Sequence, residues 1–539
     1  MTKAMSPNMD DLEKAKTCFM QALSEFQVGD LSAAETLLRQ ALDIAPDRTS
    51  VLTNLSAVLL KQKRPDEARL YAMRSVELDP DNAEGWLNVA NSQDGLGHHE
   101  EALASYDRSI TLNSDYAEAW LSRGKTQESL MRYAEALISY DRAIVIKPDY
   151  PEAWFNRGNA LNCLRQHEEA LISYDRAIVI KPDYAESFSN RGNALVHLKR
   201  FREALASYDR AISLDPCYAL AHFNRSVCWL LLGEFNRGWK EYEWRWDIGK
   251  YGHKPSFEMP IWSGERVDGV LLTWGEQGLG DQILHASMLK QLAPLCKQLV
   301  LAVEPRLVDL TQRSFPEICV VTNATSLPEQ SFDAWLPLGD LGIHFRKSWE
   351  DFPLIPPPYL IVDPDRSARL RERLTQGKKR VCGISWISNN NEFGRHKSIR
   401  LLDLLEILRI PGIEFVDLQY GDTRKERENI QIQESVHLTR VDEVDNTNDI
   451  DGLAAVINAC DIVVTISNTT AHLAGALGKE VFLMLPYSQG LIWYWHENRD
   501  DSPWYPATRL FRQARPNAWG AVISRVAQEI QRRISQLNA

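Results

Sequence analysis

The sequence predicts a fold in two parts, an α-helical repeat array followed by an α/β region of two parallel-sheet units. The first 246 residues repeat with a period of 34, whereas beyond about residue 250 short apolar runs alternate with helical patterns. A period of this length is typical of stacked helix pairs, and alternating strands and helices favour parallel sheets covered by helices. At 539 residues the chain is also too long for a single core.

Small and aromatic residues carry the repeat. Glycine and alanine let two antiparallel helices approach closely, aromatic residues fill the gap to the next pair, and proline ends the second helix. We therefore expect about seven helix pairs over residues 11–246. The clearest aligned positions are Trp86, Trp120, Trp154 and Phe188; Gly124, Gly158 and Gly192; Tyr106, Tyr140, Tyr174 and Tyr208.

Asparagines lie on the first helices of these pairs, where the concave groove of a curved array would be lined. They are Asn156, Asn159, Asn190 and Asn193. An asparagine side chain can clamp a peptide backbone with one donor and one acceptor group. The alternative is that all four are solvated polar positions. The stretch "GWKEYEWRW" (238–246) is expected to pack the array onto the next domain.

The second part contains two sets of alternating elements joined by a proline-rich linker at about 352–366. Strands are expected in the first set at 269–274, 298–303 and 318–323, and in the second at 380–386, 414–420, 461–466 and 480–485. The expected domains are residues 11–246, 247–365 and 366–515, with a closing helix in 516–539. A ligand should bind at the carboxyl ends of the strands.

Three loops after strands carry the candidate chemistry. The first is "GEQGLGD", which supplies Gln277, Gly278, Gly280 and Asp281. Its spacing matches neither established phosphate-binding glycine motif. Asp281 would be a general base facing the cleft, or an ordinary acidic residue in the first turn of a helix.

The second loop, "WISNNNEFGRHKSI", contains Asn389, Asn390, Arg395 and Lys397 directly after a strand. Arginine and lysine at this place are suited to a diphosphate, although exposed loop cations are the alternative. Gln419, near the end of the next expected strand, is included as a further cleft residue.

The third loop, "SNTTAH", interrupts an apolar strand with hydroxyl and amide groups at the start of a helix. It supplies Ser467, Asn468, Thr469, Thr470 and His472. Free N–H groups at a helix N-terminus bind anions without a metal. Thr469 or Thr470 acting as an N-cap is the simpler interpretation, and both can hold together.

Composition excludes several classes of protein. A net charge of -12 and the lack of a long Lys/Arg run argue against nucleic-acid binding. The N-terminal residues lack the apolar core of a signal peptide, and no 18-residue apolar run is present. We therefore expect a cytoplasmic protein without a membrane span. "DPD" (363–365) resembles a metal motif but lies in the proline linker, so no metal or cofactor is expected.

The repeats resemble the tetratricopeptide repeat family, through the W…G…A…Y…P pattern quoted above. Residues 250–538 resemble GT-B glycosyltransferases related to ADP-heptose–lipopolysaccharide heptosyltransferases, especially members fused to such repeats that are similar to protein O-GlcNAc transferases. The stretches that carry this resemblance are "GEQGLGDQILHASML", "GRHKSI", "DIDGLAAVINACDIVVTISNTTAHLAGALGK" and "SPWYPATRLFRQ". The implied fold is a solenoid followed by two Rossmann-like lobes.

The resemblance implies a metal-independent, inverting glycosyltransferase that takes a nucleotide sugar as donor. Asp281 corresponds to the catalytic base, Lys397 to a diphosphate contact and His472 to the histidine of the donor-binding turn. This chain has Ser467 where relatives carry an acidic residue, which puts a heptose donor and activity itself in question. The array would present the acceptor, a protein or peptide.

Two other hypotheses about the function stay open. In one, the chain is a non-catalytic scaffold with a degenerate GT-B domain, and in the other a nucleotide-sugar epimerase. Trp493, Trp495, Trp504 and Tyr505 would stack on a sugar or base, or would seal the closing helix against the first lobe.

Overall fold

The structure is a computed structural model that describes residues 9–249, 254, 257–322, 332–353, 358–375, 380–390 and 394–538. The chain divides into two compact units, Met1–Asp215 and Pro216–Ala539. The first unit holds six helix pairs, and the seventh pair belongs to the second unit. Each unit is described separately below.

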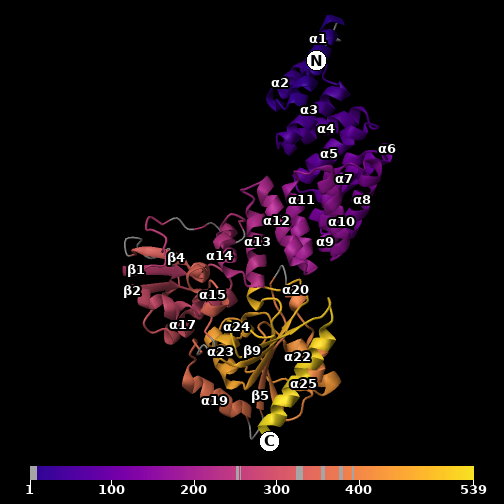
Figure 1. The fold of residues 1–539 in the computed structure, drawn as a ribbon. Coiled ribbons are helices and arrows are strands. Elements are labelled where there is room, and N and C mark those ends of the chain that lie inside the picture. Colours follow the sequence, from indigo (N-terminus) through magenta and orange to yellow (C-terminus); the bar gives the residue numbers. More distant parts are fainter. Residues whose placement is uncertain are drawn as a thin grey trace. The chain divides into compact units, whose positions relative to one another are not determined.

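The helix pairs of the first unit follow one another in chain order (Figure 1). Helices α2 to α12 are 13 or 14 residues long, which gives each repeat the same two-helix build. The helices are α1 Met9–Val28, α2 Leu31–Ile44, α3 Thr49–Lys61, α4 Pro65–Leu78, α5 Ala83–Gly95, α6 His99–Leu112, α7 Ala117–Ser129, α8 Tyr133–Ile146, α9 Pro151–Cys163, α10 His167–Ile180, α11 Ala185–His197 and α12 Phe201–Leu214.

Glycine and tyrosine set the spacing within the later pairs. A Cβ atom added to Gly158 would lie 2.6 Å from the ring of Tyr174, so the tyrosine packs directly on the backbone of α9. The same contact recurs one repeat earlier and one repeat later, at Gly124 and Gly192. This is the close helix approach that the sequence predicts, and a larger residue would force the helices apart.

The second unit begins with α13 Ala219–Leu232, α14 Phe235–Tyr242 and the short 3-10 helix η1 Glu243–Trp246. A four-stranded parallel sheet follows, with strand order β3-β2-β1-β4. Its strands are β1 Val267–Trp274, β2 Cys296–Ala302, β3 Cys319–Val321 and β4 Ala334–Pro337. The connecting helices are α15 Leu279–Ala286, α16 Leu289–Leu292, η2 Ala293–Leu295, η3 Pro305–Leu307, α17 Val308–Ser314, η6 Leu338–Leu341, α18 Gly342–Phe345 and η7 Trp349–Asp351.

A second parallel sheet has five strands in the order β6-β5-β7-β8-β9. Its strands are β5 Arg380–Ser385, β6 Ile413–Asp417, β7 Ile462–Ile466, β8 Glu480–Leu485 and β9 Thr508–Arg512. Its helices are α19 Pro364–Thr375, α20 Gly394–Lys397, η8 Leu401–Leu404, α21 Leu405–Leu408, α22 Arg424–Glu434, α23 Ile450–Ala459, α24 Thr469–Ala476, η9 Trp493–Trp495 and α25 Trp519–Asn538.

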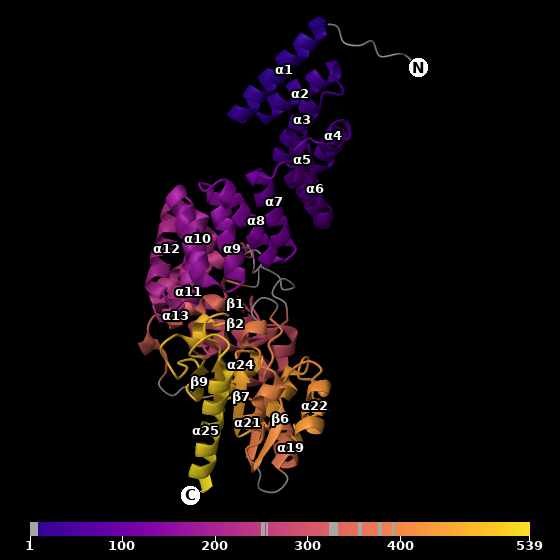
Figure 2. The same cartoon turned by 90° about the vertical axis from the view of Figure 1, so that its right-hand side faces the viewer.

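The closing helix α25 completes the core of the second sheet. Its buried face includes Val522, Val526 and Ile530, which belong to one core cluster with side chains from β5, β7 and β8. Figure 2 shows α25 lying beside this sheet. The sequence predicts this helix and seven of the nine strands found in the described residues. It does not foresee β4, β9 or α22, and α19 begins at Pro364, inside the stretch expected to be a linker. Proline at the first position of a helix is a favoured start, because its missing N–H is not needed there.

In both sheets the chain adds strands first on one side of a starting strand and then on its other side. In the first sheet the chain moves from β1 out to β3 and then returns to the other side of β1 with β4. In the second it moves from β5 to β6 and then resumes on the other side of β5 with β7. Open parallel sheets bind ligands at the carboxyl ends of strands beside such switch points. Among the described residues, no helix combines the length and apolar character needed to cross a bilayer.

Candidate functional site

The three loops singled out by sequence follow β1, β5 and β7, the strands that flank the two switch points. The loop after β1 leads into α15, the loop after β5 into α20, and the loop after β7 into α24. One residue from each loop, Asp281, Lys397 and His472, belongs to one electrostatically coupled cluster, because the charge of Lys397 lowers the pKa of both Asp281 and His472.

Asp281 lies in the first turn of α15. Burial raises the pKa of its carboxyl to about 6, and the charge of Lys397 and hydrogen bonds from the backbone of Gly278 and Asp281 oppose this rise. A carboxylate with a pKa near 6 is mostly ionised at pH 7 and is a stronger base than an exposed aspartate.

Lys397 ends α20 and is 5% exposed. Burial lowers the pKa of its ammonium group to about 8, and the negative charge of Asp281 limits this fall. Asp281 follows a strand of the first sheet and Lys397 follows a strand of the second, yet the charge of each shifts the pKa of the other. They are therefore an electrostatically coupled pair of opposite charges, both ionised between about pH 6 and 8, in which Lys397 is buried and Asp281 is partly buried.

His472 lies in α24 and is 2% exposed. Its Nδ1 is 2.9 Å from the hydroxyl of Tyr505 and its Nε2 is 3.2 Å from the hydroxyl of Tyr494. Burial and the charge of Lys397 lower the pKa of the ring to about 3, so the imidazole is neutral at pH 7. A Cβ atom on Gly280 would lie 2.7 Å from this ring, which explains why glycine precedes Asp281.

The residues before His472 are held by internal hydrogen bonds. The Ser467 hydroxyl accepts a hydrogen bond of 2.8 Å from Nε1 of Trp495. The Asn468 amide donates to the Ser385 hydroxyl at 2.8 Å, and its oxygen accepts from the backbone of Ala471. Ser467 and Asn468 therefore shape the turn through contacts inside the protein.

Asn468 is the N-cap of α24, and Thr469 is the first helical residue. The expectation that Thr469 or Thr470 caps this helix is wrong. The physical reason is that the Asn468 carboxamide oxygen can reach the N–H three residues ahead while its N–H₂ bonds to Ser385. Thr469 is half-buried, and the Thr470 hydroxyl lies 3.5 Å from that of Ser385.

Gln277 and Gly278 build the turn before Asp281. The Gln277 side chain contacts the Tyr242 hydroxyl at 3.0 Å, and its carbonyl accepts a hydrogen bond from the Gln282 side chain. Gly278 occupies the N-cap position of α15. Both residues therefore help place Asp281 without forming part of the charged pair.

Gln419 is 1% exposed, and its hydrogen bonds connect the end of β6 with the loop after β5. Its side-chain oxygen accepts hydrogen bonds from the backbone N–H groups of Trp386 and Ile387, which begin the loop that leads to Lys397. Its own N–H donates to Asp417, the last residue of β6.

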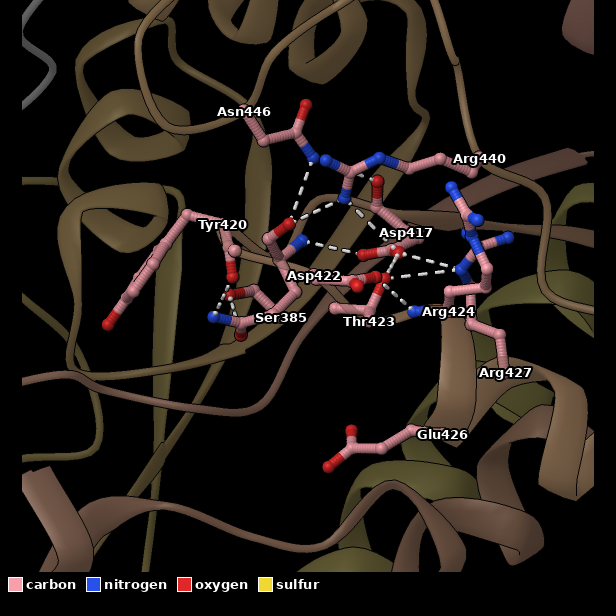
Figure 3. A network of polar contacts seen from close by, with 12 residues as sticks. Ser385, Asp417, Tyr420, Asp422, Thr423, Arg424, Glu426, Arg427, Arg440 and Asn446 are labelled. Carbon is pink, nitrogen blue, oxygen red and sulfur yellow. Dashed lines mark hydrogen bonds and ion pairs between the residues drawn. The ribbon is translucent and has the colours of Figure 1, made fainter.

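Asp417 lies at the centre of the polar network shown in Figure 3. Its carboxylate is 2.5 Å from the Thr423 hydroxyl, 3.3 Å from Arg427 and 3.2 Å from Arg440. Burial raises its pKa above the ordinary value against these partners. The sequence pattern did not indicate this network. The network holds Gln419 in place, and Gln419 in turn holds the start of the loop after β5.

Asn389, Asn390 and Arg395 lie outside the coupled cluster and are exposed. The Asn389 N–H donates to the Tyr420 hydroxyl, and the Asn390 carbonyl accepts from the N–H of Gly394 at 2.8 Å. The Arg395 guanidinium contacts the neighbouring His396 ring at 3.4 Å. Asn391, the third asparagine of this loop, lies outside the described residues.

The sequence pattern indicated no role for Tyr494 and predicted no contact between the neighbouring aromatic residues and the turn after β7. Trp495 and Tyr505 are 0% and 1% exposed, and with Tyr494 they enclose His472 and Ser467. The dense aromatic stretch from 493 to 505 was the available signal. Among the described residues, no group of three or more His, Cys, Asp or Glu is arranged to hold a metal ion.

The asparagines expected in the groove take part in contacts inside the array. The side-chain oxygen of Asn159 accepts hydrogen bonds from the Tyr174 hydroxyl at 2.9 Å and from the Asn190 amide at 2.8 Å. The oxygen of Asn193 accepts from the Tyr208 hydroxyl at 2.7 Å. Asn156 is 9% exposed. The acceptor atoms of Asn159 and Asn193 thus join helices to one another.

Comparison with known proteins identifies the repeats. Models described as tetratricopeptide repeat match residues 25–91, 83–116, 151–184 and 185–216, and one described as TPR repeat matches 132–162. The repeats of the N-terminal part are therefore tetratricopeptide repeats, as the sequence pattern predicts.

Two curated proteins are similar to parts of the chain. Protein FlbA of Caulobacter vibrioides is 32% identical over 325 residues, covering 55% of this chain and 52% of its own length. Protein STIP1 homolog of Dictyostelium discoideum is 32% identical over 96 residues, covering 18% of this chain and 17% of its own. The chain thus spans about half the length of the first relative and less of the second.

Solved structures similar to this chain include tetratricopeptide repeat proteins. YrrB, described as a TPR protein with an unusual peptide-binding site, is 21% identical, covers 34% of this chain and 95% of its own, and has a TM-score of 0.30. A tetratricopeptide repeat protein from Parabacteroides merdae is 19% identical, with 43% and 91% coverage and a TM-score of 0.35.

Proposed function

We propose that this chain is a glycosyltransferase that moves a sugar from a nucleotide-sugar donor to an acceptor, without a metal and with inversion at the anomeric carbon. In this proposal the two parallel sheets are the two Rossmann-like lobes of a GT-B fold. The observation that carries it is the electrostatically coupled pair of Asp281 and Lys397, which stands beside both switch points.

Asp281 supplies the base of the reaction. Its carboxylate takes the proton from an acceptor hydroxyl, and the oxygen attacks the anomeric carbon from the side opposite the diphosphate. The bond from that carbon to the diphosphate oxygen breaks, and the nucleoside diphosphate leaves. The pKa of about 6 suits this step, because the group is ionised at pH 7 yet basic enough to accept a proton.

Lys397 and the start of α24 stabilise the leaving group. The protonated ammonium of Lys397 balances the charge that develops on the diphosphate, and a dry surrounding strengthens this interaction. The N–H of Ala471 is capped by Asn468, and the N–H groups of Thr469 and Thr470, which precede it in the first turn of α24, would stabilise the same charge. Neutral His472, held by its two tyrosines, offers a fixed ring that shapes the turn.

The repeat array would present the acceptor, a protein or peptide, in its groove. Tetratricopeptide arrays offer an extended concave surface for this purpose. Asn190 is the asparagine through which a peptide contact would be tested first, because it is half-buried, whereas Asn156 is buried and the oxygens of Asn159 and Asn193 accept hydrogen bonds from tyrosines.

The test is transfer and hydrolysis with a panel of UDP-, GDP- and ADP-sugars, comparing the wild type with Asp281→Asn. Asparagine keeps the size of the side chain and cannot accept the proton. We expect turnover of at least one donor, and a fall of about 10²–10⁴-fold in kcat in the variant. No turnover and no nucleotide binding across the panel would contradict the proposal.

A second candidate is a non-catalytic scaffold. It is favoured by the turn after β7, where Ser467 replaces an acidic residue of the related enzymes and is bonded to Trp495. Calorimetry with UDP, GDP and ADP distinguishes the two functions. A scaffold would show no heat of nucleotide binding, whereas the enzyme would bind one nucleotide and lose affinity on Lys397→Met.

A further inference from the structure

The segment that follows the seventh helix pair makes a buried contact with the loop that carries Asp281. Arg245, in η1, is 0% exposed and reaches two carboxylates. One is Glu276, at 3.0 Å, the second residue of the loop Gly275–Asp281, and the other is Asp340, at 2.6 Å, in η6 after β4.

Aromatic rings hold this arginine on both sides. Its guanidinium carbon lies 4.7 Å from the ring centres of Tyr242 and Trp246, and one of its N–H groups donates to the Tyr242 carbonyl at 3.1 Å. Arginine has a planar fork that can stack on rings and bind carboxylates at the same time, which a lysine cannot reproduce. The position of the guanidinium is therefore tightly defined.

Glu276 is equally enclosed. Its side chain is 4% exposed and accepts hydrogen bonds from the N–H of Gly339 at 3.2 and 3.3 Å. A Cβ atom on residue 339 would lie 2.3 Å from this carboxylate, so glycine is required for the approach. Burial raises the pKa of Glu276 to about 7, and Arg245 opposes this rise.

A second contact reaches the same loop from α14. The Tyr242 hydroxyl lies 3.0 Å from the Gln277 amide. Residues 276 and 277, which lie five and four positions before Asp281, are thus both bonded to the segment Tyr242–Trp246. The loop has three glycines, at 275, 278 and 280, and these backbone positions offer little conformational restraint of their own.

We infer that Arg245, supported by Tyr242, is a positioning residue that fixes the Gly275–Asp281 loop, so that the seventh helix pair completes the candidate active site. The catalytic role of the loop rests on the proposed function, whereas the fixing of the loop does not. Arg245 touches neither substrate nor Asp281 in this inference and acts through Glu276.

Hydrogen exchange of the full chain tests the fixing of the loop without any substrate. Arg245→Lys, Glu276→Gln and Tyr242→Phe are compared with Arg225→Lys, a matched control. Arg225 pairs with Glu241 on α14, a carboxylate that lies outside the Gly275–Asp281 loop. We expect exchange in a peptide covering 275–281 to rise at least tenfold in Arg245→Lys and Glu276→Gln, and less in Tyr242→Phe, with exchange of the β7 peptide unchanged.

Turnover of the donor found by the panel then tests the consequence for the site. We expect kcat to fall at least tenfold in Arg245→Lys with KM for the nucleotide sugar changed less than threefold, because the donor contacts are intact. Loop exchange equal to wild type in both charge variants would overturn the inference. A rise in loop exchange with kcat unchanged would overturn the link to catalysis. An inactive wild type with raised loop exchange would refute the proposed function and leave the fixing of the loop supported.

Discussion

Lys397 is a charged residue placed where charge is costly, and its replacement by methionine tests that cost. Methionine has a similar length and no charge. The difference between the ordinary lysine pKa of 10.5 and about 8 corresponds to about 3 kcal/mol of folding free energy missing at pH 7. Loss of Lys397 also raises the pKa of Asp281 further, which subtracts from the gain. From the lowered lysine pKa we therefore expect Lys397→Met to raise the free energy of unfolding at pH 7 by about 1–3 kcal/mol.

The sign of the pH dependence is fixed by the same pKa values. The folded state holds fewer protons on Lys397 than the unfolded chain does between about pH 8 and 10.5, so the wild type recovers stability over that range. The advantage of Lys397→Met should accordingly be constant below pH 8 and shrink towards pH 10.5.

Pulse proteolysis in urea measures this effect, with peptides of Pro216–Ala539 quantified so that the second unit is followed by itself. The control is Lys425→Met, which removes an exposed lysine on α22 and should change stability by less than about 0.5 kcal/mol. A Lys397→Met protein that is less stable than wild type at pH 7, or whose gain persists at pH 10.5, would refute the reasoning.

Three further predictions follow from the same structure. The rate of donor turnover should have a bell-shaped dependence on pH. It should rise with an apparent pKa near 6 as Asp281 ionises and fall with an apparent pKa near 8 as Lys397 loses its proton. Initial rates from about pH 5 to about pH 9.5 measure this dependence. Gly158→Ala should destabilise the array by about 1–3 kcal/mol, measured by thermal unfolding of helicity, because its Cβ would overlap Tyr174. Ser467→Ala should cost about 1–3 kcal/mol, measured by pulse proteolysis of the second unit, because it leaves a buried tryptophan N–H without its acceptor.

Each of these has a control or an opposing result. Gly520→Ala is the control for Gly158→Ala, because the Cβ atom added at residue 520 would meet no atom within 4 Å. An alanine in a helix there should leave stability unchanged or raise it by up to about 1 kcal/mol. A bell that keeps its upper limb in Lys397→Met would exclude that lysine as the group responsible. Full stability of Ser467→Ala would show that Trp495 finds another acceptor.

The array was predictable because its constraints repeat. Three successive 34-residue units place glycine opposite tyrosine, as at Gly158 and Tyr174, so the pattern can be recognised even where a single copy departs from it. Most strands of the second unit were also foreseen, because parallel strands buried on both faces appear as continuous apolar runs. β4 and β9 escaped, since "AWLP" and "TRLFR" are short and interrupted by proline or charge.

The candidate site could be foreseen only in part. The loops after β1, β5 and β7 were identified because polar residues stop apolar strands there, and parallel strands bring such stops to one edge. The partners of these loops come from distant positions: Tyr505 reaches His472 across 33 residues, and Arg245 reaches Glu276 across 31. No local pattern reports such pairing, so it required the tertiary structure.

The most direct test of the central claim is the rate of sugar release or transfer from the nucleotide-sugar panel by the wild type and by Asp281→Asn at pH 7. The account predicts measurable turnover of one donor by the wild type, a loss of about 10²–10⁴-fold in kcat in the variant, and nucleotide affinity within threefold of wild type. Equal rates in the two proteins, or no turnover and no nucleotide binding by the wild type, would contradict it.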